Sequence, residues 1–163
     1  MTTKAATLEL EVPAGEPVIL FRRFVAAPPE LVWDLYTSCE HLRNWWGPRA
    51  LEMVECSVDV RPGGAWRHVV RAADGSTHRF GGRYVTVDRP HTLSCTFAYD
   101  GVPGQEALDT VTFAAVDGGT MIAGRSDHGS VEARDAHVAS GMESGMRDSY
   151  DRLAELLTAV QAA

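Results

Sequence analysis

The order of apolar and polar residues along the chain predicts a series of short β-strands. In several segments the two kinds of residue alternate, and a period of two residues is typical of strands with one buried face. Turn-forming residues separate these segments, for example Asp74-Gly75, a dipeptide that favours a tight hairpin. The predicted strands cover residues 17–25, 50–60, 65–72, 77–88, 91–99, 108–116 and 120–126. Tight turns between successive strands indicate an antiparallel sheet.

Two short helices are predicted after the first strand, and a long helix is predicted at the C-terminus. Pro28 and Pro29 favour a helix start, because the first turn does not use the N–H that proline lacks. A second short helix is expected to carry His41 to Trp45. Residues 131–162 are expected to be helical, with 131–139 as a possible separate first part. From residue 140 the apolar residues recur at helical spacing and form one stripe: Met142, Met146, Tyr150, Leu153, Leu157 and Val160.

These elements predict an α+β fold of the helix-grip type. The long helix must bury its apolar stripe against the sheet, so a curved antiparallel sheet of six to seven strands is expected to wrap around it. Two short helices follow the first strand of that sheet. We expect residues 1–16 to form a poorly ordered or strand-like N-terminal extension. Residues 17–162 are expected to form a single domain, which is an ordinary length for one.

The composition excludes several classes of partner. The chain has 163 residues and a formal net charge of −7, and a field of that sign repels nucleic acid and anionic membranes. No segment approaches the roughly 18 apolar residues of a membrane span. The N-terminus lacks the apolar centre of an export signal. We therefore expect a cytoplasmic protein, in which Cys39, Cys56 and Cys95 are free thiols.

Five segments resemble a known family when they are taken together and in order. They are APPELVWDLYTSCEHLRNWWGP, VDVRPGGAWRHVVRAADG, FGGRYVTVDRPHTLSCTFAYDG, VTFAAVDGGT and SVEARDAHVASGMESGMRDSYDRLAELL. The resemblance is to the START-like (SRPBCC) superfamily, and within it to bacterial proteins related to the C-terminal domain of the activator of Hsp90 ATPase. It implies a deep, mostly apolar cavity between the sheet and the long helix. The superfamily includes lipid and hormone binders, polyketide cyclases and oxygenase domains, so membership predicts architecture better than chemistry.

Alternation within the strands selects residues that would face this cavity. The candidate ligand-binding residues are Trp45, Trp46, Trp66, His68, Phe80, Cys95, Phe97, Tyr99, Phe113, Ser126, Met142, Met146 and Tyr150. The sequence does not decide which face of the sheet Phe80 occupies, because Gly81-Gly82 suggests a bulge that would switch the alternation of side chains. Gly124 would leave room for a ligand. The same residue types also fill ordinary cores, so each candidate is either core or cavity wall.

Few of the candidate residues carry chemistry. His68 could orient a ligand or move a proton, or it could be a structural histidine with one partner. Ser126-Asp127-His128 contains the residue types of a catalytic triad, but neighbours in a strand point to opposite faces, so no triad is predicted. An apolar setting would make Cys95 unreactive. No metal-binding or cofactor-binding motif is present, and we predict no catalytic residue, metal or cofactor.

Three functions are compatible with this pattern. The first is binding of a small apolar, aromatic or lipid-like molecule in the cavity. The second is a cyclase/aromatase-like or hydrolase-like enzyme that uses the same cavity, with His68 or an inward-facing Asp or Arg moving protons. The third is a partner of an Hsp90-type chaperone. Eukaryotic Hsp90 activators carry a further N-terminal domain, and only 16 extra residues stand here, so this third function is not expected. A homodimer is possible, since sheet edges and Trp-rich ends associate readily.

Overall fold

The computed structural model describes residues 7–163. Eight strands form one antiparallel sheet in the order β1-β2-β8-β7-β6-β5-β4-β3. The strands are β1 (Glu9–Glu11), β2 (Val18–Val25), β3 (Glu52–Val58), β4 (Ala65–Arg71), β5 (Thr77–Asp88), β6 (Thr92–Tyr99), β7 (Ala107–Val116) and β8 (Gly119–Asp127). The helices are α1 (Pro29–Thr37), α2 (Cys39–Leu42), α3 (Val131–Ala139) and α4 (Met142–Ala162).

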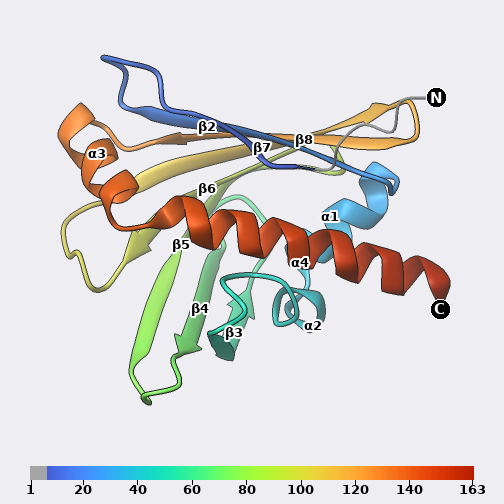
Figure 1. The fold of residues 1–163 in the computed structure, drawn as a ribbon, viewed down its shortest axis with the longest axis horizontal. Coiled ribbons are helices and arrows are strands. Elements are labelled where there is room, and N and C mark those ends of the chain that lie inside the picture. Colours follow the sequence, from blue (N-terminus) through green and yellow to red (C-terminus); the bar gives the residue numbers. More distant parts are fainter. Residues whose placement is uncertain (1–6) are drawn as a thin grey trace.

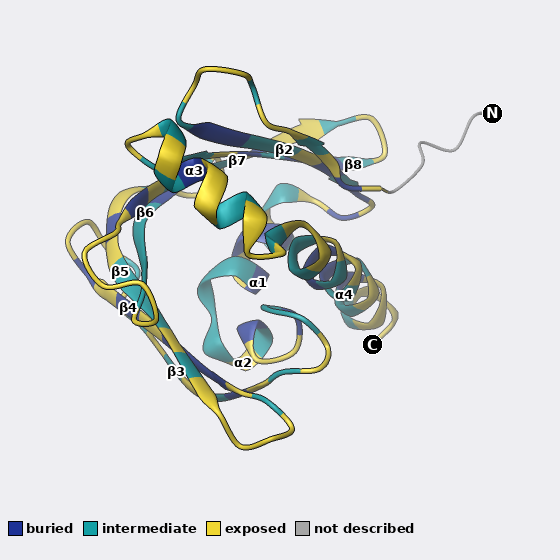
Figure 2. Cartoon of the chain, turned by 60° about the vertical axis from the view of Figure 1, so that its left-hand side comes forward, coloured by how far each residue is buried: buried dark blue, intermediate teal, exposed yellow. Residues whose placement is uncertain are grey.

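The sheet curves around the helices, as the helix-grip prediction requires. Figure 2 shows the strands bending around α1, α2 and α4, with α3 close to β2 and β6. In Figure 1, α4 runs across the molecule between β2, β7 and β8 on one side and β3 and β4 on the other. The apolar stripe of α4 faces this interior, and Leu153 and Leu157 are completely or almost completely buried. The α+β helix-grip fold is therefore confirmed.

The sheet has one strand more than the six to seven predicted. The additional strand, β1, lies in the expected N-terminal extension and pairs with β2 in the register Glu9↔Arg22 to Glu11↔Leu20. A turn that contains Gly15 connects the two strands. The extension was expected to be poorly ordered or strand-like, and three residues are too few for the alternation of apolar and polar positions to decide between the two. Residues 1–6 of this extension lie outside the described residues.

The C-terminal helical region is divided into two helices. Gly141 has a φ of 88°, a left-handed conformation that glycine adopts without strain, and it stands directly before α4. The side chain of Ser130 accepts a hydrogen bond from the backbone N–H of Ala133 and caps the start of α3. The separate first part suggested by residues 131–139 is thus a helix of its own.

The predicted bulge at Gly81-Gly82 is absent, and the irregularity lies further along β5. Pairing of β5 with β6 keeps one register from Phe80↔Tyr99 to Tyr84↔Cys95, and the register shifts between Tyr84 and Thr86. Phe80 and Tyr84 therefore share the face of β5 that looks into the sheet's curve. Gly82 has another explanation, because a Cβ atom at this position would collide with the backbone of Thr96.

The prediction of three free thiols was wrong for two of them. Cys39, the first residue of α2, and Cys56 in β3 form a disulfide with Cα atoms 5.7 Å apart. Cys95 is free. The sequence contained no spacing that indicated this pair, because the two cysteines meet only after α2 folds back onto β3. The disulfide fixes α2 to the edge of the sheet.

Within residues 7–163 no helix is long and apolar enough to cross a membrane.

Candidate ligand-binding site

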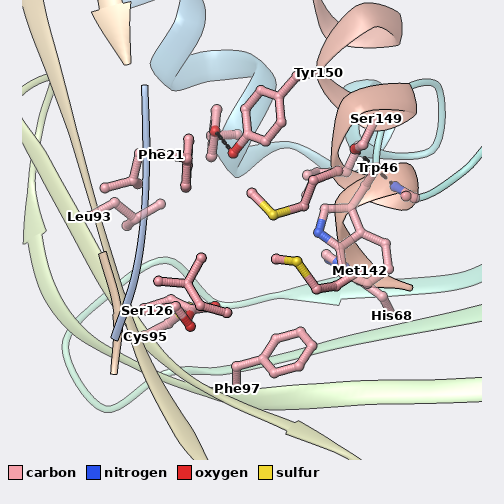
Figure 3. Close-up of a pocket in the computed structure, with 18 of the residues that line it drawn as sticks. Phe21, Trp46, His68, Leu93, Cys95, Phe97, Ser126, Met142, Ser149 and Tyr150 are labelled. Atoms are coloured by element: carbon pink, nitrogen blue, oxygen red, sulfur yellow. Dashed lines mark hydrogen bonds between the residues drawn. The ribbon is translucent and has the colours of Figure 1, made fainter. Parts of the chain in front are cut away.

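A cavity of about 310 Å³ lies between the inner face of the sheet and α4. Its floor comes from β2, β4, β5, β6, β7 and β8, and its cover comes from α4 and the segment that follows α2. Apolar side chains dominate the lining, and Figure 3 shows Met142 and Tyr150 directed toward Cys95, Leu93 and Phe21 on the sheet. The volume falls at the lower end of the range for small-molecule sites, about 300–1,000 Å³.

Ten of the thirteen candidate residues meet at this cavity. They are Trp45, Trp46, Trp66, His68, Cys95, Phe97, Ser126, Met142, Met146 and Tyr150. The grouping follows from two periodicities, since the strand residues alternate onto the inner face and the α4 residues share one stripe. The lining also includes residues that the sequence pattern did not select, among them Phe21, Tyr36, Asp109 and His137.

Phe80, Tyr99 and Phe113 lie outside the lining. Phe113 is 2% exposed and packs edge-on against Trp33 and Tyr36 in the core between the sheet and α1. Phe80 stacks on Tyr99 with ring centroids 4.8 Å apart and also packs against Trp46 and Phe97, so it borders the lining without belonging to it. Tyr99 is held there by a hydrogen bond between its hydroxyl and Nδ1 of His78, at 2.7 Å. Alternation selects the correct face of a strand, but it does not tell how far along the strand the cavity extends.

Gly124 does not leave room for a ligand. The position that a Cβ atom would take is occupied by the ring of Phe21, the cross-strand neighbour of Gly124. Phe21 also packs against Tyr150, with ring centroids 5.1 Å apart. The absent side chain therefore makes space for an aromatic ring of the protein, which then becomes part of the cavity wall.

His68 is buried in an aromatic setting and lacks a hydrogen-bond partner. It is 4% exposed, and its ring lies edge-on to Trp46 at 4.6 Å and to Trp66 at 4.9 Å. Among the described residues, neither Nδ1 nor Nε2 has a partner. Burial lowers the pKa of His68 to about 4, because the low-dielectric surroundings disfavour the charged ring. At neutral pH His68 is thus an uncharged imidazole that offers one donor and one acceptor.

A chain of polar groups lies on the sheet across the cavity from His68. Ser126 donates a hydrogen bond from Oγ to Oδ1 of Asp109 at 2.6 Å, and its Oγ is 3.1 Å from Nε2 of His128. Burial raises the pKa of Asp109 to about 6, and the hydrogen bond from Ser126 opposes this shift. His128 packs against His137 of α3 with ring centroids 4.8 Å apart. Burial lowers the pKa of His137 to about 4.

This arrangement is not a catalytic triad. In a triad the histidine stands between the carboxylate and the nucleophile, whereas here the serine stands between the carboxylate and the histidine. Asp127 points away from the chain of bonds and lies 3.6 Å from Arg125. The side chains brought together are Ser126 of β8, His128 directly after that strand, and Asp109 of the neighbouring strand β7. Asp109 could have been selected from the sequence, since it stands four residues before the candidate Phe113 and therefore shares its strand face.

Two further groups in the lining have little reactivity. The hydroxyls of Tyr36 and Tyr150 are 2.6 Å apart, and burial raises the pKa of both. Burial also raises the pKa of Cys95 to about 12, so its thiol stays protonated at neutral pH. In residues 7–163 no three His, Cys, Asp or Glu side chains are grouped closely enough to hold a metal ion.

A curved antiparallel sheet that grips a long C-terminal helix around an apolar cavity defines the START-like class of proteins. The model of the family described as "Activator of Hsp90 ATPase homolog 1-like protein" matches residues 26–158, and the chain belongs to this family. The resemblance inferred from the sequence segments is therefore confirmed. The comparison with curated proteins gives no match.

Solved structures of bacterial proteins share the fold over nearly their full length. A Rhodobacter sphaeroides protein is 35% identical with a TM-score of 0.88, and the match covers 94% of this chain and 99% of that one. A Nitrosomonas europaea protein is 26% identical with a TM-score of 0.82, covering 93% and 100%. A Mycobacterium smegmatis protein, 22% identical with a TM-score of 0.83 over 91% and 95% of the two chains, shows the likeness of fold alone.

Proposed function

We propose that this protein binds a small apolar molecule, with an aromatic or lipid-like body, in the cavity between the sheet and α4, and that it does so without a cofactor. The cavity is lined by aromatic and sulfur-containing side chains, among them Trp46, Trp66, Phe97 and Met142. Aromatic rings supply large contact areas, and methionine adapts its shape to the body that it contacts. The few polar groups would orient the ligand.

The observation that carries this proposal is the unpartnered imidazole of His68 in the cavity wall. A buried donor or acceptor without a partner costs about 1–3 kcal/mol, so proteins seldom retain one that has no use. A ligand with one polar atom on an apolar body would supply the missing hydrogen bond after a small movement of Trp46, whose ring covers the imidazole. A substitution of His68 by an apolar residue would remove this cost, but it would also remove the hydrogen bond to the ligand.

A thermal-shift screen tests the proposal. Fatty alcohols, sterols and aromatic polyketides are the probes, since they differ in shape but share an apolar body. Cys95→Phe places a ring in the floor of the cavity and is expected to abolish the rise in melting temperature that a bound probe causes. The control is Val85→Phe, because Val85 is 51% exposed on the other side of the sheet. The proposal is rejected when no probe stabilises the wild type, or when Cys95→Phe responds to a probe as well as Val85→Phe does.

An enzyme that uses the same cavity is the second candidate, and Asp109 is the observation that favours it. A carboxyl with a pKa near 6 is suited to accept a proton at neutral pH. A cyclase-type reaction would need such a base close to a reactive polyketone chain. Incubation of the wild type and of Asp109→Asn with a polyketone thioester, followed by mass spectrometry, tests this. Equal product formation by both proteins and by buffer alone would dismiss the enzyme.

We also propose a cytoplasmic location and a homodimer, and each can be tested. A cytoplasmic location has one observation against it, since a reducing cytosol disfavours the Cys39–Cys56 disulfide. Labelling of free thiols in protein quenched directly from cells would show whether the bond forms there. Analytical ultracentrifugation tests the proposed homodimer. A pull-down with the host's Hsp90 homologue tests the chaperone partnership, for which we expect no binding.

A further inference from the structure

The cavity contains one carboxylate and no cation to balance it. Among the described residues that line the cavity, Asp109 is the one acidic side chain. The one arginine in the lining, Arg125, has a side chain that is 55% exposed and is directed to Asp127 outside. His68 and His137 are neutral at pH 7, because burial lowers the pKa of each to about 4. The negative charge on Asp109 therefore has no ionic partner in the cavity.

Hydrogen bonding satisfies only half of this carboxylate. Ser126 donates to Oδ1 of Asp109, whereas Oδ2 has no hydrogen-bond partner among the described residues. Asp109 is partly buried and lines the cavity, and its Oδ2 is not among the fully enclosed atoms that lack a partner, so Oδ2 keeps accessible surface. Buried charges in proteins are paired or bind a ligand. The polar and titratable groups around Asp109 supply no positive charge: Cys95 of β6, Ser126 of β8, His128 directly after β8, His137 of α3 and Tyr150 of α4.

We propose that the cavity selects amines, that is, molecules with an apolar or aromatic body and a protonated nitrogen that donates a hydrogen bond to Oδ2 of Asp109. This inference rests on the proposed function and narrows its ligand class. An ammonium group would supply the missing charge, and a charge-assisted hydrogen bond is about twice as strong as a neutral one. The body would extend toward Phe97 and Trp46, which Figure 3 shows farther along the cavity, apart from Cys95 and Ser126.

The rest of the molecule favours the same ligand class. The formal net charge of −7 produces a negative field that attracts cations and repels carboxylates. Aromatic rings such as those of Trp66 and Phe97 attract a cation through their negatively charged faces. A fatty acid, by contrast, would bring a second negative charge beside Asp109, and like charges in a low-dielectric site repel strongly.

Isothermal titration calorimetry at about pH 7.5 with three probes of one skeleton tests the inference. The probes are naphthylethylamine, naphthylethanol and naphthylacetate, which are a cation, a neutral molecule and an anion. The wild type is expected to bind the amine at least about tenfold more tightly than the alcohol, and to bind the carboxylate most weakly. Asp109→Asn keeps the shape of the side chain and should weaken amine binding at least about tenfold while changing alcohol binding less than about twofold.

The control variant is Asp117→Asn, which makes the same change in net charge on the exposed turn between β7 and β8. It should leave all three affinities unchanged, so that an effect of the overall field is separated from an effect inside the cavity. The inference is overturned when the wild type binds the alcohol as tightly as the amine, or when Asp109→Asn leaves the preference intact. Either of these two results would leave the proposal of an apolar binding site unaffected. Failure of all three probes to bind would count against the proposed function as well.

Discussion

Replacing His68 by Phe should remove a large part of the protein's sensitivity to acid. The ring of His68 is almost fully buried against Trp46 and Trp66, and within residues 7–163 no charged side chain contributes to the shift of its pKa. Burial alone therefore lowers the pKa of His68, from the ordinary 6.5 to about 4. Phe keeps an aromatic ring against both tryptophans and cannot take up a proton.

The sign and the size of the effect follow from proton linkage. The unfolded chain protonates His68 below about pH 6.5, whereas the folded protein resists protonation until about pH 4. Stability is therefore present above the unfolded pKa and is lost as the pH falls between these values. At about pH 5 the loss through His68 alone is about 2 kcal/mol, and below pH 4 it reaches about 3 kcal/mol.

Urea unfolding of the wild type and of His68→Phe at about pH 7.5 and pH 5 measures this difference. Between the two pH values the wild type should lose about 2 kcal/mol more free energy of unfolding than the variant. His137 titrates in both proteins, so its contribution cancels in the comparison. His91→Gln, a change at an exposed position, should behave like the wild type. Equal pH dependence of wild type and His68→Phe would refute the argument that burial keeps this imidazole neutral.

Three further changes have outcomes that follow from the structure. Reduction of the Cys39–Cys56 bond, or the double change to Ala, should lower the free energy of unfolding by about 3 kcal/mol, since the two cysteines are 17 residues apart; urea unfolding with and without dithiothreitol measures it. Phe113→Ala should cost about 3–5 kcal/mol by the same assay without changing probe binding, because Phe113 packs in the core and not in the cavity. Asp109→Asn should raise the free energy of unfolding at about pH 7.5 by about 1–2 kcal/mol. The reason is the raised pKa of Asp109, because of which the wild type loses stability as the pH rises through about 6. The gain in the variant should vanish near pH 4, and a gain that persists there would contradict this reasoning.

The parts of the site that the sequence revealed are those governed by a regular period. Trp66 and His68, or Cys95 and Phe97, share a face because strand side chains alternate, and Met142, Met146 and Tyr150 share a stripe because a helix repeats every 3.6 residues. The same rules predicted the antiparallel sheet and the long helix that encloses the cavity. Local periodicity is sufficient here because each element buries a single face.

What the sequence did not reveal depends on distances between elements. Three contacts join segments that no local pattern relates. They are the Cys39–Cys56 disulfide, the Tyr36–Tyr150 hydrogen bond and the packing of His137 against His128. Phe113 shares the inner face of β7 with Asp109, yet one belongs to the core and the other to the cavity, because α1 covers only one end of that strand. The depth of a residue along a strand is set by which helix packs above it, and periodicity carries no information about that.

A ligand in the space between the sheet and α4 should change the surroundings of the tryptophans that line it. An NMR titration that follows the indole N–H signals of the four tryptophans measures this change. Trp45, Trp46 and Trp66 line the cavity, whereas Trp33 packs in the core against Phe113. The Nε1–H of Trp66 bonds to the backbone carbonyl of Thr96, which fixes a reporter in the wall. Saturation with naphthylethanol should shift the signals of Trp46 and Trp66 and leave that of Trp33 in place. Unchanged signals of Trp46 and Trp66, with or without a shift of Trp33, would contradict binding in this cavity.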